Sequence, residues 1–352
     1  MYSGVYVTAL GASTPVGRDA WSTAAAVRAS ITGFAEHPYM LDTAGEPMRV
    51  ARAPWLDMDC EGADRFAELL LPALAEALEP IAAIGPTAIR VALALALPIP
   101  RRGLPETLER DLRLRIEMAF PDRFTAIGVF PHGHAAGFVA MRAACDRIDG
   151  GLFDASVVAG VESYLARATL EWLEETNQLH GAGVRNNAWG FIPGEGAGAV
   201  LLMGETIEDV GLEPFARVLS VGIGFEQNRI KTNTVCIGEG LTAAFREGIA
   251  ALPPGSQITD VFCDMNGEPY RADEFGFACL RTKEAFVSAS DFVAPAENWG
   301  DVSAASAPLQ TVLSGIAAQK AYANGPFAFL WASSESGERG ASLLQLPFDS
   351  GE

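Results

Sequence analysis

The histidine at position 134 stands where a side chain can do chemistry, at the start of a predicted helix. Pro131 and Gly133 mark a tight turn, and the residues from His134 onward are small or apolar, which predicts a buried helix. A side chain in the first turn of a helix faces free backbone N–H groups and the positive end of the helix dipole. This environment stabilises negative charge and suits a nucleophile or an oxyanion partner. The imidazole of His134 takes this position, with His132 nearby in the turn.

Alternating strands and helices must position this turn. Continuous apolar runs predict buried strands, and apolar residues at helical spacing predict helices. Strands are expected at 5–10, 89–97, 155–163, the end of 189–203, 216–223, 258–265, 327–332 and 341–346, the last two as an antiparallel pair. One helix is expected to begin after a cap at Asp19, and another to begin at Asp64 with a kink at Pro72. Further helices are expected at 104–120, from 134, at 169–177, 240–251 and 271–286, and in the small-residue segment that ends near 322. Residues 33–58 are predicted to be surface loop. This alternation indicates an α/β layered fold.

Composition and charge narrow the classes of function. Of the 352 residues, 49% are hydrophobic and 20% are charged, which is typical of a globular protein. The net charge of −19 argues against nucleic acid and anionic membranes as partners. It also argues against unaided capture of an acidic carrier protein, unless residues such as Arg101 and Arg102 cluster locally. The longest apolar run, 91–100, is shorter than the ~20 residues of a membrane-spanning helix, and no signal peptide is seen, so we expect a cytoplasmic protein.

The cysteines and glycines predict neither a metal site nor a cofactor. The five cysteines are Cys60, Cys145, Cys236, Cys263 and Cys279, and their wide spacing fits no disulfide framework or zinc motif. Cys145 lies eleven residues beyond His134, about three helical turns away, which removes it from the site. Cys263 ends an apolar strand and is expected to be an inert buried thiol. The glycine-containing loop at 11–17 lacks the lysine and the glycine spacing of nucleotide-binding loops.

Three glycine-containing segments occur in a defined order along the chain. They are VYVTALGASTPVG at 5–17, GVES at 160–163 and GFIPGEGAGA at 190–199. In the same order they resemble segments of the β-ketoacyl-[acyl-carrier-protein] synthases of the thiolase superfamily. The resemblance implies a five-layer αβαβα sandwich built from two similar halves, expected at 1–205 and 206–352 within one compact unit. It also implies a homodimer or pairing with another ketosynthase-like subunit, and an acyl-carrier protein or acyl thioester as ligand.

The resemblance also locates the site at which this family acts, where a cysteine takes up the acyl chain and two histidines help decarboxylation and stabilise the enolate. His134, in the segment Gly133 to Gly137, stands at the cysteine position. Asn266 and Asp301 stand at the two histidine positions, and the family's lysine is missing near Ala296. Imidazole does not carry an acyl group as readily as a thiolate, and Asn266 has no titratable proton. We therefore expect no standard condensation.

Two interpretations follow from these changes. In the first, the protein is a non-condensing homologue that acts by binding an acyl group, a carrier or a protein partner, and His134 is a buried, hydrogen-bonded histidine. Asn266 and Asp301 then line a retained pocket or satisfy hydrogen bonds of their neighbours. The other pocket candidates are His132, Gly133, Asp264 and Glu268.

In the second interpretation, the protein is a divergent acyltransferase or thioester hydrolase. His134 would pair with Asp301 as a general base, and Asn266 would donate a hydrogen bond to an oxyanion. The acidic residues Asp264, Glu268 and Asp301 alternatively offer oxygen ligands for a hard cation, although acidic residues in loops more often face water.

Overall fold

Strands and helices alternate along most of the chain, as the sequence predicts. The computed structural model describes residues 2, 4–85 and 88–348. The strands are β1 (Tyr6–Ser13), β2 (Phe34–Leu41), β3 (Pro47–Ala51), β4 (Val91–Ala96), β5 (Ala126–Phe130), β6 (Ala155–Ser163), β7 (Glu195–Met203), β8 (Ala216–Phe225), β9 (Asp260–Cys263), β10 (Phe327–Ser333) and β11 (Glu338–Gln345). The helices are α1 (Ala20–Arg28), α2 (Gly62–Leu78), α3 (Leu108–Ala119), α4 (Ala136–Asp149), α5 (Arg167–Glu175), α6 (Ile207–Val210), α7 (Glu239–Ile249), α8 (Pro269–Thr282), α9 (Ala296–Trp299) and α10 (Ser306–Gln319).

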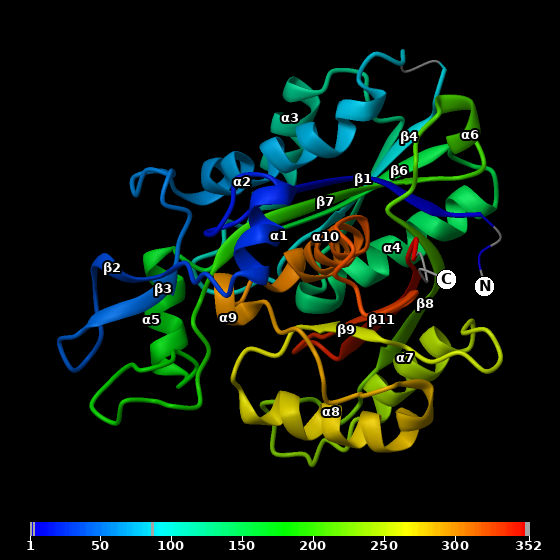
Figure 1. Ribbon diagram of the computed structural model, residues 1–352. Coiled ribbons are helices and arrows are strands. Elements are labelled where there is room, and N and C mark those ends of the chain that lie inside the picture. Colours follow the sequence, from blue (N-terminus) through cyan, green and yellow to red (C-terminus); the bar gives the residue numbers. More distant parts are fainter. Residues whose placement is uncertain (1, 3, 86–87, 349–352) are drawn as a thin grey trace.

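Helices α4 and α10 form the middle of five layers (Figure 1). Each of them contacts strands from both parts of the chain, β4, β6, β8 and β11 for α4 and β1, β7, β9 and β10 for α10. Helix α2 covers the outer face of β1, β6 and β7, with α3 packed against it. On the opposite side, α7 covers β8 and β11, and α8 packs against α7. This is the αβαβα arrangement that the resemblance implies.

The strand order repeats between the two parts of the chain. The nine-stranded sheet has the order β5-β4-β6-β7-β1-β8-β11-β10-β9. In the first part, β1 pairs antiparallel with β7, β7 pairs antiparallel with β6, and β6 pairs parallel with β4. In the second part, β8, β11, β10 and β9 pair in the same sequence of directions. The two parts join where β1 pairs with β8 at Tyr6 and Val7. This repeat is consistent with the predicted halves 1–205 and 206–352, whose boundary stays a prediction.

Small residues let the middle layer approach the sheet closely. A Cβ atom at Gly160 on β6 would lie 2.2 Å from the carbonyl oxygen of Ala304, in the turn before α10. A Cβ at Gly137 on α4 would lie 2.7 Å from the side chain of Ala307 on α10. These contacts explain in physical terms why glycine stands at positions 160 and 137, since a larger residue would separate the layers.

The structure corrects three predictions. Residues 33–58 are not simply surface loop, because β2 and β3 form a separate antiparallel hairpin there. The five-residue strand β5 was not predicted at all; it lies at the edge of the main sheet and is only partly buried. The helix expected at 104–120 begins later, at Leu108. In the hairpin and in β5, exposed polar or small residues interrupt the apolar pattern on which strand prediction depends.

Candidate functional site

His134 lies in a 3-10 turn, Gly133–Ala135, that leads directly into α4. Gly133 has a φ of +67°, a conformation that favours glycine. The backbone N–H of Ala135 donates to Oγ of Ser334 at 2.7 Å. A residue from the second half of the chain therefore satisfies one of the backbone N–H groups that are left without a partner at the start of a helix. His134 is only 5% exposed. The turn therefore directs its imidazole into the protein interior.

The imidazole of His134 contacts Asp301, which comes from the loop before α10. Its Nε2 lies 2.9 Å from Oδ2 and 3.0 Å from Oδ1 of the carboxylate. Asn266 donates from Nδ2 to Oδ2 of Asp301 at 2.6 Å, and the backbone N–H of Ser303 donates to Oδ1 at 2.8 Å. The structure thus brings together His134, Asn266 and Asp301, the three residues that the resemblance placed in one site.

Sequence reasoning missed Arg271, which lies at the centre of this site. Its guanidinium, fully buried on α8, places Nη2 3.1 Å from Nε2 of His134 and donates from Nη1 to Asp264 at 2.6 Å. Asp264 also accepts the backbone N–H of Ser333 at 2.8 Å. One signal was available in the sequence, because Glu268 stands three residues before Arg271, where the helix predicted at 271–286 begins, and this spacing lets the two side chains meet.

Glu268 links these residues to the surface through Lys231. The carboxylate of Glu268 accepts from Asn266 Nδ2 at 3.0 Å and lies 3.0 Å from Nζ of Lys231. Tyr270 donates its hydroxyl to the same carboxylate. We call His134, Asp264, Asn266, Glu268, Arg271 and Asp301 together the His134 cluster. Because the cations Arg271 and Lys231 already lie against its carboxylates, the cluster does not favour the hard cation that the sequence left open.

His132 does not join the cluster. Its Nδ1 lies 3.2 Å from Oε1 of Glu338, and its side chain is about one-third exposed. Its carbonyl oxygen accepts a hydrogen bond from Ser334. His132 is therefore not an obvious proton-transfer partner for His134, despite its proximity in sequence.

Little open space lies beside His134. Two hollows border the residue, each with a volume of about 20 Å³. A volume of this size holds about one water molecule. A much larger cavity, of about 610 Å³, lies elsewhere, between the β2–β3 hairpin, the start of α2 and α5. The His134 cluster is therefore closed in this structure.

One known protein family is similar to the part of the chain that begins at this site. The model of the β-ketoacyl synthase N-terminal domain matches residues 133–206, a segment that begins at the turn of His134. This segment of the chain is therefore similar to the N-terminal domain of β-ketoacyl synthases. No curated protein matches the chain.

Solved ketosynthase structures share the fold of this chain over almost its whole length. A chain of AntDE:AntF, a type II polyketide synthase acyl-carrier protein in complex with its ketosynthase, is 14% identical, with a TM-score of 0.83 over 99% of this chain and 100% of that one. The ishigamide ketosynthase/chain length factor is 15% identical, with a TM-score of 0.79 over 98% and 100%. A ketosynthase from module 6 of the bacillaene synthase of Bacillus subtilis 168 is 14% identical, with a TM-score of 0.77 over 99% and 72%.

The electrostatics of the site keep two of its carboxylates, Asp301 and Glu268, ionised. Burial alone would raise the pKa of Asp301, but His134, Arg271 and Asn266 outweigh it and hold that pKa well below its ordinary value. Burial also opposes ionisation of Glu268, yet Lys231 and Arg271 lower its pKa. Both carboxylates are therefore charged at neutral pH, and each has opposite charge beside it.

The two glutamates of the family motifs make buried ion pairs. Glu162 pairs with Arg101 at 2.6 Å, and Glu195 pairs with Arg65 at 2.6 Å. All four side chains are at most 6% exposed. These motifs thus support the fold around the site. Because Arg101 is buried, it contributes no exposed charge to a basic surface patch.

The cysteines offer no activated thiol near His134. Burial raises the pKa of both Cys145 and Cys263 far above the ordinary value of a thiol. Cys263 borders the hollow beside His134, but it lies at the end of β9 and is 1% exposed. Both are protonated at neutral pH and are poor nucleophiles, as the sequence predicts. None of the described helices is long and apolar enough to span a membrane.

Proposed function

We propose that this ketosynthase-like protein does not condense acyl groups and acts by binding a second ketosynthase-like chain. In this proposal, His134, Asn266 and Asp301 occupy the places of the family's cysteine and two histidines. The closed His134 cluster is the observation that carries the proposal. A nucleophile must be free to meet its substrate, whereas the ring nitrogen of His134 that faces the cluster contacts both Asp301 and Arg271.

The space beside His134 disfavours a small ligand there, and the net charge disfavours a carrier protein. A site for a small organic ligand usually has a volume of about 300–1,000 Å³, far above the 20 Å³ hollows beside His134. The net charge of −19 opposes an acidic carrier. Among the structures that share this fold, one is a ketosynthase/chain length factor and another contains a ketosynthase with a carrier protein. A ketosynthase-like chain is therefore the partner that these observations favour.

The edge strand β5 is the surface that best suits such a partner. Within the part of the chain that the structure describes, β5 pairs on one side only, with β4. Its outer side offers backbone groups to which another strand can add. Arg113 donates to the carbonyl oxygen of Ile127 at 2.9 Å and must move when a strand binds. The Arg113 side chain is about one-third exposed, so it can turn into solvent.

An acyltransferase or thioester hydrolase is the second candidate, favoured by the 2.9 Å contact between His134 and Asp301. Such a pair activates a nucleophile or a water molecule in many hydrolases. The contact with Arg271 opposes this role, because the guanidinium lies against the ring nitrogen that would have to meet the substrate.

Turnover of acyl thioesters separates the two candidates. Wild type, His134→Ala and Asp301→Ala are compared for hydrolysis of an acyl thioester and decarboxylation of a malonyl thioester. The proposal predicts no release above background for any of the three proteins. Turnover by wild type that falls in both variants would instead establish the second candidate.

Light scattering of the purified protein tests the binding surface. We expect a dimer for wild type, since a second copy is the simplest ketosynthase-like partner. Ala126→Lys places a charge on the exposed edge of β5 and should give a monomer. Leu280→Lys, at a side chain 73% exposed on α8, is the matched control and should stay dimeric. A monomeric wild type, or a dimer that persists in the Ala126→Lys variant, would contradict this interface.

A further inference from the structure

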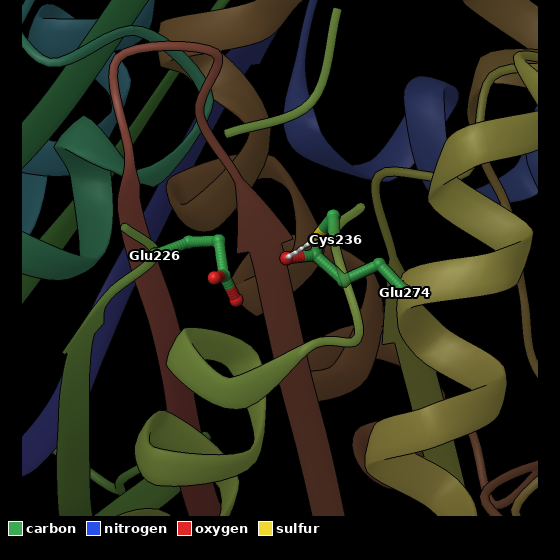
Figure 2. A group of neighbouring side chains, drawn as sticks. All are labelled: Glu226, Cys236 and Glu274. Atoms are coloured by element: carbon green, nitrogen blue, oxygen red, sulfur yellow. Dashed lines mark hydrogen bonds between the residues drawn. The ribbon is translucent and has the colours of Figure 1, made fainter. Parts of the chain in front are cut away.

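Three metal-ligating side chains meet in the second half of the chain, away from the His134 cluster. They are Glu226, just after β8, Cys236, in the loop before α7, and Glu274, on α8 (Figure 2). One potential ligand atom from each lies within 4.8 Å of the other two. The two carboxylates point toward each other, and the thiol of Cys236 lies 3.7 Å from Oε1 of Glu274 (Figure 2).

One carboxylate oxygen of this group is buried without a hydrogen-bond partner. Glu274 is 1% exposed, and its Oε1 accepts from Nε of Arg339 at 2.6 Å. Its Oε2 has no hydrogen-bond partner among the described residues. An unpaired buried carboxylate oxygen is costly, and in native structures such an atom commonly indicates an ion or water that binds there.

Glu226 retains the capacity to bind a cation. Its Oε2 accepts the backbone N–H of Gly240 at 2.8 Å, and its Oε1 accepts that of Asn228 at 3.1 Å. A carboxylate oxygen has two lone-pair sites, so each oxygen of Glu226 can still coordinate an ion. The side chain is 1% exposed, which places a second negative charge beside Glu274 in the interior.

We propose that Glu226, Cys236 and Glu274 bind one Zn²⁺ ion. A thiolate with carboxylates selects a borderline-soft divalent ion such as Zn²⁺ over Mg²⁺ or Ca²⁺. On binding, the S–H bond of Cys236 breaks, the sulfur coordinates the ion, and the proton passes to solvent. The charges then balance, since two carboxylates and one thiolate face Arg339 and Zn²⁺. Zn–S and Zn–O bonds of about 2.3 and 2.1 Å require the ligand atoms to be about 3.5 Å apart, so atoms that lie up to 4.8 Å apart must move closer when the ion binds.

The ion would fasten the loop that carries Lys231. Residues 226 and 236 lie near the two ends of the segment between β8 and α7, and Glu274 would tie both to α8. Lys231, in the middle of this segment, lies 3.0 Å from Glu268 of the His134 cluster. Zinc binding thereby stabilises the position of Lys231. The inference does not depend on the proposed function, because it concerns binding of an ion at a separate place.

Zinc titration of the full-length protein tests the proposal. The protein is stripped with a chelator, titrated with ZnCl₂ against a chromophoric chelator, and its zinc content is measured after dialysis. We expect one equivalent for wild type and for Cys60→Ser, a control at another partly exposed thiol. Cys236→Ser and Glu274→Gln should bind at least about 100-fold more weakly, because each loses one of three protein ligands.

Cobalt substitution identifies the ligand directly. Wild type loaded with Co²⁺ should show a thiolate-to-metal charge-transfer band that is absent in Cys236→Ser. Cys236→Ser leaves the Glu274–Arg339 ion pair in place and is expected to fold, so it decides the question even where Glu274→Gln does not fold. Less than half an equivalent of zinc in wild type, or equal affinity in Cys236→Ser, would overturn the proposal.

Discussion

Replacing Asp301 with asparagine tests how strongly the His134 cluster depends on its central carboxylate. Asp301 is 3% exposed and contacts the imidazole of His134, the amide of Asn266 and the backbone N–H of Ser303. Asp301→Asn keeps the shape of the side chain but leaves the buried cation Arg271 with one negative neighbour fewer. Removing one partner of a buried ion pair costs about 3–5 kcal/mol of unfolding free energy. We expect a loss of this size at pH 7.

The pKa of Asp301 determines how this loss of unfolding free energy changes with pH. The folded-state pKa of Asp301 is depressed below the value of about 3.9 in an unfolded chain. A depressed pKa contributes stability that is fully present above the unfolded value and is lost as pH falls toward the folded value. The difference in unfolding free energy between wild type and Asp301→Asn should therefore be constant from pH 7 to 5 and shrink below about pH 4.

Urea unfolding monitored by circular dichroism measures both effects. With an m-value of about 3 kcal/mol per M, a loss of 3 kcal/mol lowers the midpoint by about 1 M. Asp291→Asn, at an exposed aspartate, is the matched control and should leave the midpoint nearly unchanged. A change below about 1 kcal/mol for Asp301→Asn, or a difference that grows as the pH falls, would refute the reasoning.

Three further predictions concern the fold around the site. Gly160→Ala should abolish soluble expression or lower the melting temperature by many degrees, because its Cβ would lie 2.2 Å from the carbonyl oxygen of Ala304; unchanged melting would show that the layers can separate. Phe245→Ala should lower the free energy of unfolding, measured with urea, by about 3–5 kcal/mol, because this buried ring packs against other aromatic rings, one with its centroid 4.9 Å away. A loss under about 1 kcal/mol would mean that neighbouring side chains fill the space. Cys145 and Cys263 should react with a thiol reagent only after unfolding, because both are buried and their pKa values are raised; rapid labelling of either in the native protein would contradict this.

The sequence predicts the buried framework well because burial leaves a pattern within each segment. Strand β6 was predicted at 155–163, the bounds that the structure has, since nine consecutive buried residues favour a central strand. The β2–β3 hairpin was missed because its residues are mostly exposed and its pairing is irregular between Glu36 and Leu41. Here partners elsewhere in the fold, rather than local pattern, determine the structure.

The site was predictable only in part. The resemblance to ketosynthases placed His134, Asn266 and Asp301 together, and the structure does bring them into contact. Arg271 escaped prediction because its partner His134 is far away in the sequence, and a single sequence carries no record of long-range ion pairs. The closure of the site was likewise invisible, since it depends on how side chains from several elements fill one space.

The mass of the intact protein after incubation with an acyl thioester tests the central claim most directly. The closed cluster around His134 predicts that wild type keeps its unmodified mass, as does His134→Ala. An acyl adduct that forms on wild type and is absent from His134→Ala would contradict the account, because it would show that the imidazole meets and carries an acyl group.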